Sequence, residues 1–181
     1  MKKLLTLLLF TAVLTSCKKQ GKKKIALNES KIDYTQLVDP FIGTRKMGHV
    51  FPGATAPFGM VQLSPQTNFE VMFNEDGNYN PETYEYCAGY QYRDTTIIGF
   101  SHTNFSGTGH SDLGDLLVMP TIGPLILEPI KSSSTKKGYY STFSHDEEKA
   151  SPGYYQVDLS SYGIKAELTA SERVGYHQYT F

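Results

Sequence analysis

The chain of 181 residues is long enough for one ordinary domain with its own core. It carries 17 basic and 18 acidic residues, so its net charge of −1 gives no electrostatic reason to expect a nucleic-acid partner. There is no tryptophan, but 13 tyrosines and 10 phenylalanines stand among 16 glycines and 9 prolines, a mixture typical of strands and turns rather than of a helical bundle.

The first predicted element is a targeting segment that is not part of a folded domain. Three residues with two lysines precede an apolar run over residues 4–14, which is too short to span a bilayer because that takes roughly 20 residues. Ser16 then precedes Cys17, as in the lipobox of bacterial lipoproteins. This pattern predicts a signal peptide over residues 1–16 and lipid on the Cys17 thiol. The alternative is an ordinary secretory signal with an incidental cysteine, and either interpretation places the mature chain outside the cytoplasm.

Residues 17–33 are predicted to be a flexible, lysine-rich tether. Five lysines lie between residues 18 and 28 with little apolar content, so burial cannot offset the entropy lost on ordering. Lysines close to a membrane also attract anionic lipid, although a solvated spacer is the simpler interpretation.

Cys87 is the only cysteine besides Cys17. If Cys17 carries lipid, Cys87 has no partner and no disulfide framework is possible. Cys87 is therefore interpreted as a small buried hydrophobic residue. The alternative is a catalytic thiol, which would need a base beside it.

Residues 34–181 are predicted to form an all-β domain, an antiparallel β-sandwich. Strand-like runs, separated by turns rich in Gly, Pro and Ser, occur at residues 58–63, 89–100, 115–119, 154–159 and 173–181. Between residues 163 and 170 apolar and polar side chains alternate, which is the pattern of a half-buried strand. No amphipathic helix of 12 or more residues emerges, and residues 66–85 are predicted to be a long loop.

The last predicted strand runs to residue 181 without a turn residue or a polar tail. We therefore expect the polypeptide to continue in the natural protein and the sandwich to be incomplete here. The alternative is a small domain whose last strand is also its terminus.

Two loops concentrate polar chemistry, and the first spans residues 39–62. Its closely spaced glycines and prolines exclude regular structure, while its aromatic residues must be buried somewhere, so a rigid loop is expected. His49 and Arg45 are the side chains able to reach a ligand from it. The alternative is an exposed turn with a solvated arginine and histidine.

The second loop, residues 99–112 (GFSHTNFSGTGHSD), supports several interpretations. Zinc could use His102, His110 and Asp112, but this spacing matches no usual site. A phosphate loop would need a lysine and a following helix, and a serine nucleophile would need a G-x-S-x-G elbow; both are missing here.

A carbohydrate site needs hydrogen-bonding side chains and an aromatic platform. His102, Asn104, Phe105 and Asp112 supply that mixture in the second loop. The structural alternative is a polar loop whose side chains bond to one another and to their own backbone. The residues alone leave these two interpretations open.

Three blocks of the sequence resemble glycoside hydrolase family 92. They are residues 38–65 (with VDPFIGT and GHVFPGATAPFGMVQLSP), residues 98–116 (IGFSHTNFSGTGHSDLGDL) and residues 173–181 (RVGYHQYTF). The resemblance implies an exo-acting, calcium-dependent, inverting α-mannosidase of a bacterial cell envelope that processes mannose-containing glycans. It also implies an N-terminal β-sandwich of the supersandwich type, similar to galactose mutarotase, followed by an (α/α)6 catalytic domain.

The resemblance implies that the catalytic carboxylates and the calcium ligands lie downstream of Phe181, so no catalytic or metal-binding residue is assigned here. His49, His102, Asn104, Phe105 and Asp112 are the candidate substrate-binding residues, and Phe105 is expected to stack on the leaving sugar. Two departures from the family pattern affect the expected sugar contacts: Asn104 stands where the family has histidine, and residues 45–47 replace a more glycine-rich run.

The expected partners are a mannose-containing glycan, the C-terminal catalytic domain of the same polypeptide and a membrane reached through the lipid on Cys17; nucleic acid is not expected. Alone, the chain is expected to bind sugar without hydrolysing it. The rival interpretations are a non-catalytic glycan-binding lipoprotein of the cell surface and a purely structural sandwich.

Overall fold

The computed structural model describes residues 32–181 except residues 71, 111–112, 131–133 and 136. The predicted signal peptide, the predicted lipidation site Cys17 and most of the tether lie outside these residues. Residues 33–181 form one compact unit.

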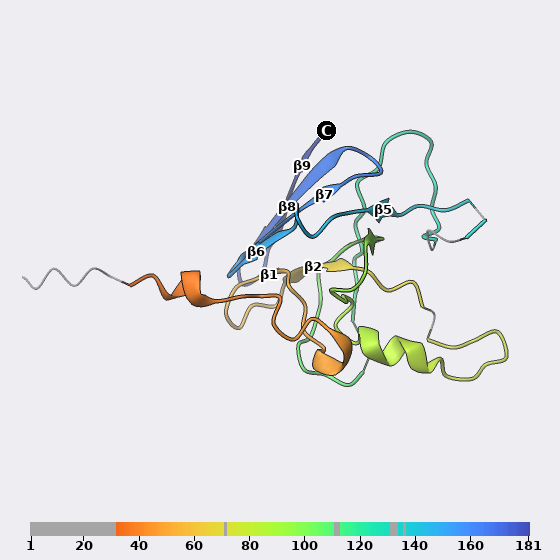
Figure 1. Cartoon of the computed structure of the whole chain (residues 1–181), viewed down its shortest axis with the longest axis horizontal. Helices are drawn as coiled ribbons and strands as arrows, with labels where there is room; N and C mark the ends of the chain where they lie inside the picture. Colours follow the sequence, from red (N-terminus) through yellow and green to blue (C-terminus); the bar gives the residue numbers. More distant parts are fainter. Residues whose placement is uncertain (1–31, 71, 111–112, 131–133, 136) are drawn as a thin grey trace, which may run out of the picture. The chain divides into compact units, whose positions relative to one another are not determined.

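A four-stranded antiparallel sheet forms the C-terminal part of this unit (Figure 1). Its strands follow chain order: β6 (Lys149–Ser151), β7 (Tyr154–Leu159), β8 (Ile164–Ala170) and β9 (Gly175–Thr180). Two tight turns connect β6 to β7 and β7 to β8, and each has a glycine in the left-handed region, Gly153 at φ +79° and Gly163 at φ +65°. The period-two pattern places Ile164, Ala166 and Leu168 in the core with at most 1% exposure, because alternate side chains of a strand point to opposite faces.

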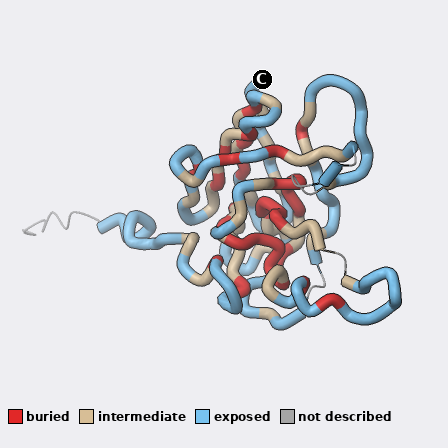
Figure 2. The backbone as a smooth tube through the Cα atoms, turned by 45° about the vertical axis from the view of Figure 1, so that its right-hand side comes forward, coloured by how far each residue is buried: buried red, intermediate tan, exposed pale blue. Residues whose placement is uncertain are grey.

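A second antiparallel sheet packs against the first, so that the two form a sandwich. It has the order β1-β2-β4, with β1 at Ala54–Thr55, β2 at Gln62–Gln66 and β4 at Gly99–Ser101. A small separate ladder pairs β3 (Thr96–Ile97) with β5 (Ser141–Thr142). The core lies between the two sheets, where Leu63 and Phe100 meet Tyr155, Val157 and Leu168. Figure 2 shows buried backbone concentrated in these strands and exposed backbone in the long loops.

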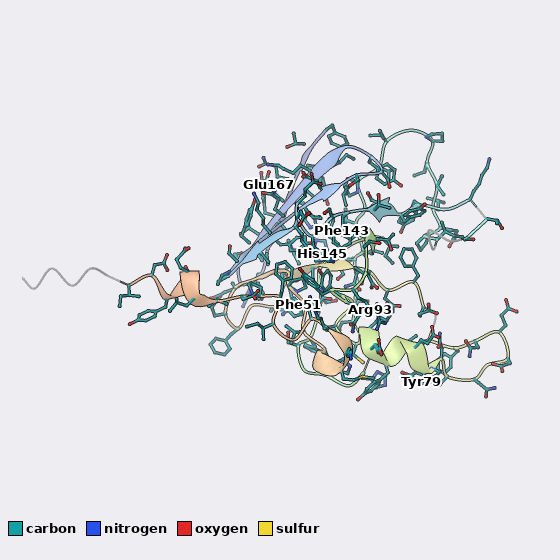
Figure 3. All side chains as sticks on the ribbon, in the orientation of Figure 1. Phe51, Tyr79, Arg93, Phe143, His145 and Glu167 are labelled. Atoms are coloured by element: carbon teal, nitrogen blue, oxygen red, sulfur yellow. The ribbon has the colours of Figure 1, made fainter. Side chains whose placement is uncertain are left out.

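One carboxylate is buried in this core. Glu148, with 7% exposure, accepts hydrogen bonds from the hydroxyls of Tyr90 (3.0 Å) and Tyr155 (2.6 Å). His145 Nδ1 lies 2.6 Å from Glu148 Oε2, and the His145 ring also packs edge-on against Phe143 (Figure 3). Burial and the nearby Glu148 raise the pKa of Tyr155 well above its usual value. Because a buried polar group without hydrogen-bond partners is costly, these partners make Glu148 compatible with the core.

Helices are short in the described part of the chain. They are the 3-10 helices η1 (Tyr34–Leu37), η2 (Lys46–Gly48) and η3 (Pro81–Tyr86). The predicted absence of a long helix is therefore confirmed for these residues. None of the helices among them has the length and apolar character needed to cross a bilayer.

The strand predictions are confirmed at the C-terminal end and are wrong, wholly or in part, in three other places. Of the run predicted at 89–100, only β3 and the first two residues of β4 are strand. The loop predicted at 66–85 also contains most of η3. Residues 154–159 form β7 and residues 164–170 form β8, while the run at 173–181 forms the slightly shorter β9. The strand predicted at 58–63 starts only at Gln62, because Phe58 adopts a left-handed conformation (φ +57°) in a turn. Residues 115–119 form no strand; Val118 alone bridges to Phe100. The fold class, an all-β antiparallel sandwich, is nevertheless the predicted one.

Candidate functional site

The polar loop, defined here as residues 102–115, leaves the sheet at the end of β4 and returns beside it. The His102 amide donates to Asp115 O (3.0 Å), and the Gly114 amide donates to Thr103 O (2.9 Å). The Thr103 hydroxyl adds two bonds, accepting from the Asp115 amide and donating to its carboxylate. These bonds close the loop at its base, the neck, which consists of residues 102–103 and 114–115.

Asn104 anchors the polar loop from within. It is buried (3% exposed), and its Nδ2 donates to Gln62 O and to Ser101 Oγ, both at 2.9 Å. Its Oδ1 accepts from Gln66 Nε2 at 2.8 Å. Both hydrogens of the Asn104 amide are therefore in use, which is the usual state of a buried polar group. The interpretation as a self-bonded polar loop thus describes Asn104 and Ser101, and a direct sugar contact by Asn104 stays a prediction.

Phe105, the next residue, is exposed, whereas Asn104 is buried. Its side chain is 54% exposed, on a loop whose glycines allow a tight path. Gly107 adopts φ +74°, and its amide donates to His49 O at 2.7 Å. An exposed aromatic ring on a rigid base has the form of a stacking platform, as the predicted role of Phe105 requires.

His49 brings the first polar loop to the same place. It has a left-handed backbone (φ +50°) and is only 7% exposed, with its ring edge-on to Tyr84 of η3 at a centroid distance of 5.0 Å. Its Nε2 is buried and has no hydrogen-bond partner among the described residues. The alternative of a solvated His49 is therefore wrong. Arg45, in contrast, is exposed and lies over the Tyr92 ring, 4.4 Å from the centroid.

His102 lies at the neck, where it contacts the other sheet. Its Nδ1 is 2.8 Å from Leu116 O, and its Nε2 is 3.2 Å from Nε2 of His177 in β9. The two rings stack with their centroids 4.9 Å apart. Burial, and to a lesser extent the neighbouring His102, lowers the pKa of His177 to about 4, so the His177 ring is uncharged at neutral pH.

A small pocket lies between β2, η3 and the polar loop. It has a volume of about 180 Å³. Its polar lining residues are Gln66, Asn68, Glu70, Thr83 and Asn104, and the others are Met72, Tyr86, Cys87, Gly89 and Leu113. It is smaller than the roughly 300–1,000 Å³ of pockets for drug-sized ligands, which suits one small polar group such as a single sugar ring. Amides and a carboxylate are the groups that bind neighbouring hydroxyls.

Sequence reasoning missed Gln66, Asn68, Glu70 and His177. The first three lie at or beyond the end of β2, in a stretch with no periodicity that could have pointed to a pocket. His177 could have been found, because the alternation of β9 puts it on the same face as Gly175, which lies against Leu63.

Other predictions are settled in part or lie outside the described residues. Cys87 is buried and forms no disulfide with any residue that the structure describes, and its Sγ lies 3.0 Å from Tyr84 O, so its interpretation as a buried hydrophobic residue is confirmed. No cluster of three or more His, Cys, Asp or Glu that could hold a metal occurs within the described part of the chain. The candidate Asp112 is outside that part, so its proposed sugar contact stays a prediction.

The comparisons with solved structures agree in one family. Over 81% of its length, this chain is 44% identical to a family 92 α-mannosidase from Bacteroides thetaiotaomicron, solved with and without mannoimidazole, with a TM-score of 0.71. The family 92 glycosyl hydrolase ccman5 is 36% identical over 82% of this chain, with a TM-score of 0.64. This chain spans 18% and 19% of those two chains, less than a fifth of each.

A sequence relative and a family model point the same way. A protein of Arthroderma benhamiae described as an uncharacterized secreted glycosidase is 29% identical over 157 residues, which cover 82% of this chain and 17% of that protein. The family model for the glycosyl hydrolase family 92 N-terminal domain matches residues 37–181. The chain therefore belongs to glycosyl hydrolase family 92, of which it contains the N-terminal domain region.

Proposed function

We propose that this chain is the N-terminal part of an exo-acting, inverting, calcium-dependent α-mannosidase that trims mannose-containing glycans. In this proposal the chain is held at a bacterial cell envelope through lipid on Cys17. The polar loop and the adjacent pocket form one wall of the glycan site, and the catalytic domain closes it from the other side. Membership of family 92 and the 44% identity to an α-mannosidase support the substrate class.

Sugar binding by the polar loop is supported by the different surroundings of Asn104 and Phe105. The Asn104 side chain forms hydrogen bonds with Gln62, Gln66 and Ser101, which fix the loop. The Phe105 ring stays exposed. A mannose ring offers hydroxyls and an apolar face. The Glu70 carboxylate, the Asn68 amide and the Gln66 carbonyl oxygen line the pocket and suit the hydroxyls of one ring. Phe105 is outside the lining of that pocket, and its exposed ring suits the apolar face of a neighbouring sugar.

We assign the hydrolysis step to the catalytic domain of the enzyme and not to this chain. An inverting glycosidase needs two carboxyl groups roughly 6.5–9.5 Å apart, one as acid and one as base. Glu70 is the one carboxylate among the described residues that line the pocket, so the site as described lacks such a pair. The described residues contain no group of three or more His, Cys, Asp or Glu side chains that could hold a metal ion, and we assign the calcium ligands, like the acid and base, to the rest of the enzyme.

The test is a titration of the 181-residue chain with α-mannobiose by calorimetry, combined with a hydrolysis assay on the same sample. The expected result is weak, saturable binding without hydrolysis. Phe105→Ala and Glu70→Gln should each weaken binding several-fold, since each removes one contact worth roughly 1 kcal/mol. Ser106→Ala, an exposed neighbour, is the matched control. Absence of binding, or equal affinity in all variants, would refute the local role, and hydrolysis by the chain would refute the assignment of catalysis elsewhere.

A further inference from the structure

The histidine pair at the neck connects two segments that are 75 residues apart in the sequence. His102 follows β4 and begins the polar loop, whereas His177 lies in the middle of β9 on its inner face. His177 has a second partner, because its Nδ1 lies 2.8 Å from the Tyr179 hydroxyl. His102 likewise has a second partner in Leu116 O. The four groups thus form one continuous chain of hydrogen bonds.

The chemistry of the end groups fixes every hydrogen in this chain. Leu116 O can only accept, so His102 Nδ1 must carry the hydrogen. An imidazole whose one hydrogen is on Nδ1 has a lone pair on Nε2, so in this tautomer His102 accepts and His177 Nε2 carries the hydrogen between the two rings. His177 Nδ1 is left as the acceptor, and the Tyr179 hydroxyl donates to it.

We propose that His177 is a positioning residue for the polar loop. By donating from Nε2, it holds His102 in the Nδ1–H tautomer that bonds to Leu116 O. That bond and the bond from the His102 amide to Asp115 O hold the two ends of the polar loop together at its neck. Tyr179 in turn sets the tautomer of His177. The effect of this positioning on glycan binding rests on the function proposed above, whereas the positioning of the loop by His177 does not.

The direct test is long-range ¹H–¹⁵N spectroscopy of the histidine rings in the labelled chain at neutral pH. His102 is expected as the Nδ1–H tautomer and His177 as the Nε2–H tautomer, and Tyr179→Phe should broaden or shift the His177 signals alone. Finding His102 protonated at Nε2 would overturn the proposal.

Three variants separate positioning from mere packing. His177→Phe keeps a ring but removes the donor, and it should speed amide exchange at His102 and Gly114 while leaving β7 and β8 protected. His177→Gln keeps an N–H near the Nε2 position and should restore slow exchange. Gln178→Phe places the same ring on the outer face of β9 and serves as the control. Failure of the glutamine variant to restore protection would overturn the proposal.

Glycan binding gives the functional readout. His177→Phe should weaken α-mannobiose binding by roughly two- to tenfold, the equivalent of one net hydrogen bond, and His177→Gln should recover most of it. If the unmodified chain binds no mannoside but shows the expected tautomers and exchange pattern, the proposed function fails and the positioning device stands. Unchanged affinity in a mannoside-binding chain would overturn the link between the two.

Discussion

Replacing Asn104 with alanine is the most informative single perturbation of the polar loop. The substitution removes two donated bonds of 2.9 Å, to Gln62 O and Ser101 Oγ, and one accepted bond of 2.8 Å from Gln66. Each such bond contributes about 0.5–1.5 kcal/mol net, so the free energy of unfolding should fall by about 1.5–4.5 kcal/mol. Because Gln66 also reaches Ser101 Oγ, the lower half of this range is expected.

Urea unfolding followed by fluorescence or circular dichroism measures this change. Asn104→Ala should lower the urea midpoint without changing the slope m, which reports the surface exposed on unfolding. The matched control is Ser106→Ala, two residues along and exposed, whose midpoint should stay within error of the parent. A loss below about 0.5 kcal/mol for Asn104→Ala would show that its amide is not a structural anchor, and the reasoning about the loop would fail.

The remaining predictions concern the core, the loop tip and pH. Tyr155→Phe removes a 2.6 Å bond to buried Glu148 and should cost about 1–3 kcal/mol in urea unfolding, more than Tyr154→Phe on the solvent face. Phe105→Ala should leave the melting temperature unchanged, since its ring is 54% exposed, while it weakens mannoside binding. The pKa of His177 is lowered from 6.5 to about 4, so the unfolded chain takes up a proton that the folded chain excludes. Stability is therefore full above about pH 6.5 and falls as the pH drops toward about 4, by about 1–2 kcal/mol after allowance for partial exposure, and His177→Gln should reduce this slope.

Local pattern was sufficient for the strands that lie side by side in the sequence. β7 and β8 alternate over their whole length and are joined by a turn ending in Gly163, so their bounds follow from period and turn chemistry. The run at 58–63 failed because Phe58 looks like a core residue but lies in a left-handed turn with its side chain fully in solvent. Nothing in the sequence around Phe58 indicates that its ring is exposed.

The candidate site was predictable only as far as its residue types. Composition identified residues 99–112 as a chemically unusual loop, yet it could not separate Asn104, which is used by the scaffold, from Phe105, which is not. That division depends on Gln62 and Gln66, about forty residues earlier, which approach only when β2 pairs with β4. The meeting of His102 and His177 likewise depends on the packing of two sheets, which no local pattern encodes.

Residue-resolved titration of the ¹⁵N-labelled chain with α-mannobiose tests the central claim most directly. The account predicts saturable shifts of the amides around Gln66, Asn68 and Phe105, with β7 and β8 undisturbed. No shift at saturating sugar, or shifts confined to surfaces away from the polar loop and its pocket, would contradict it.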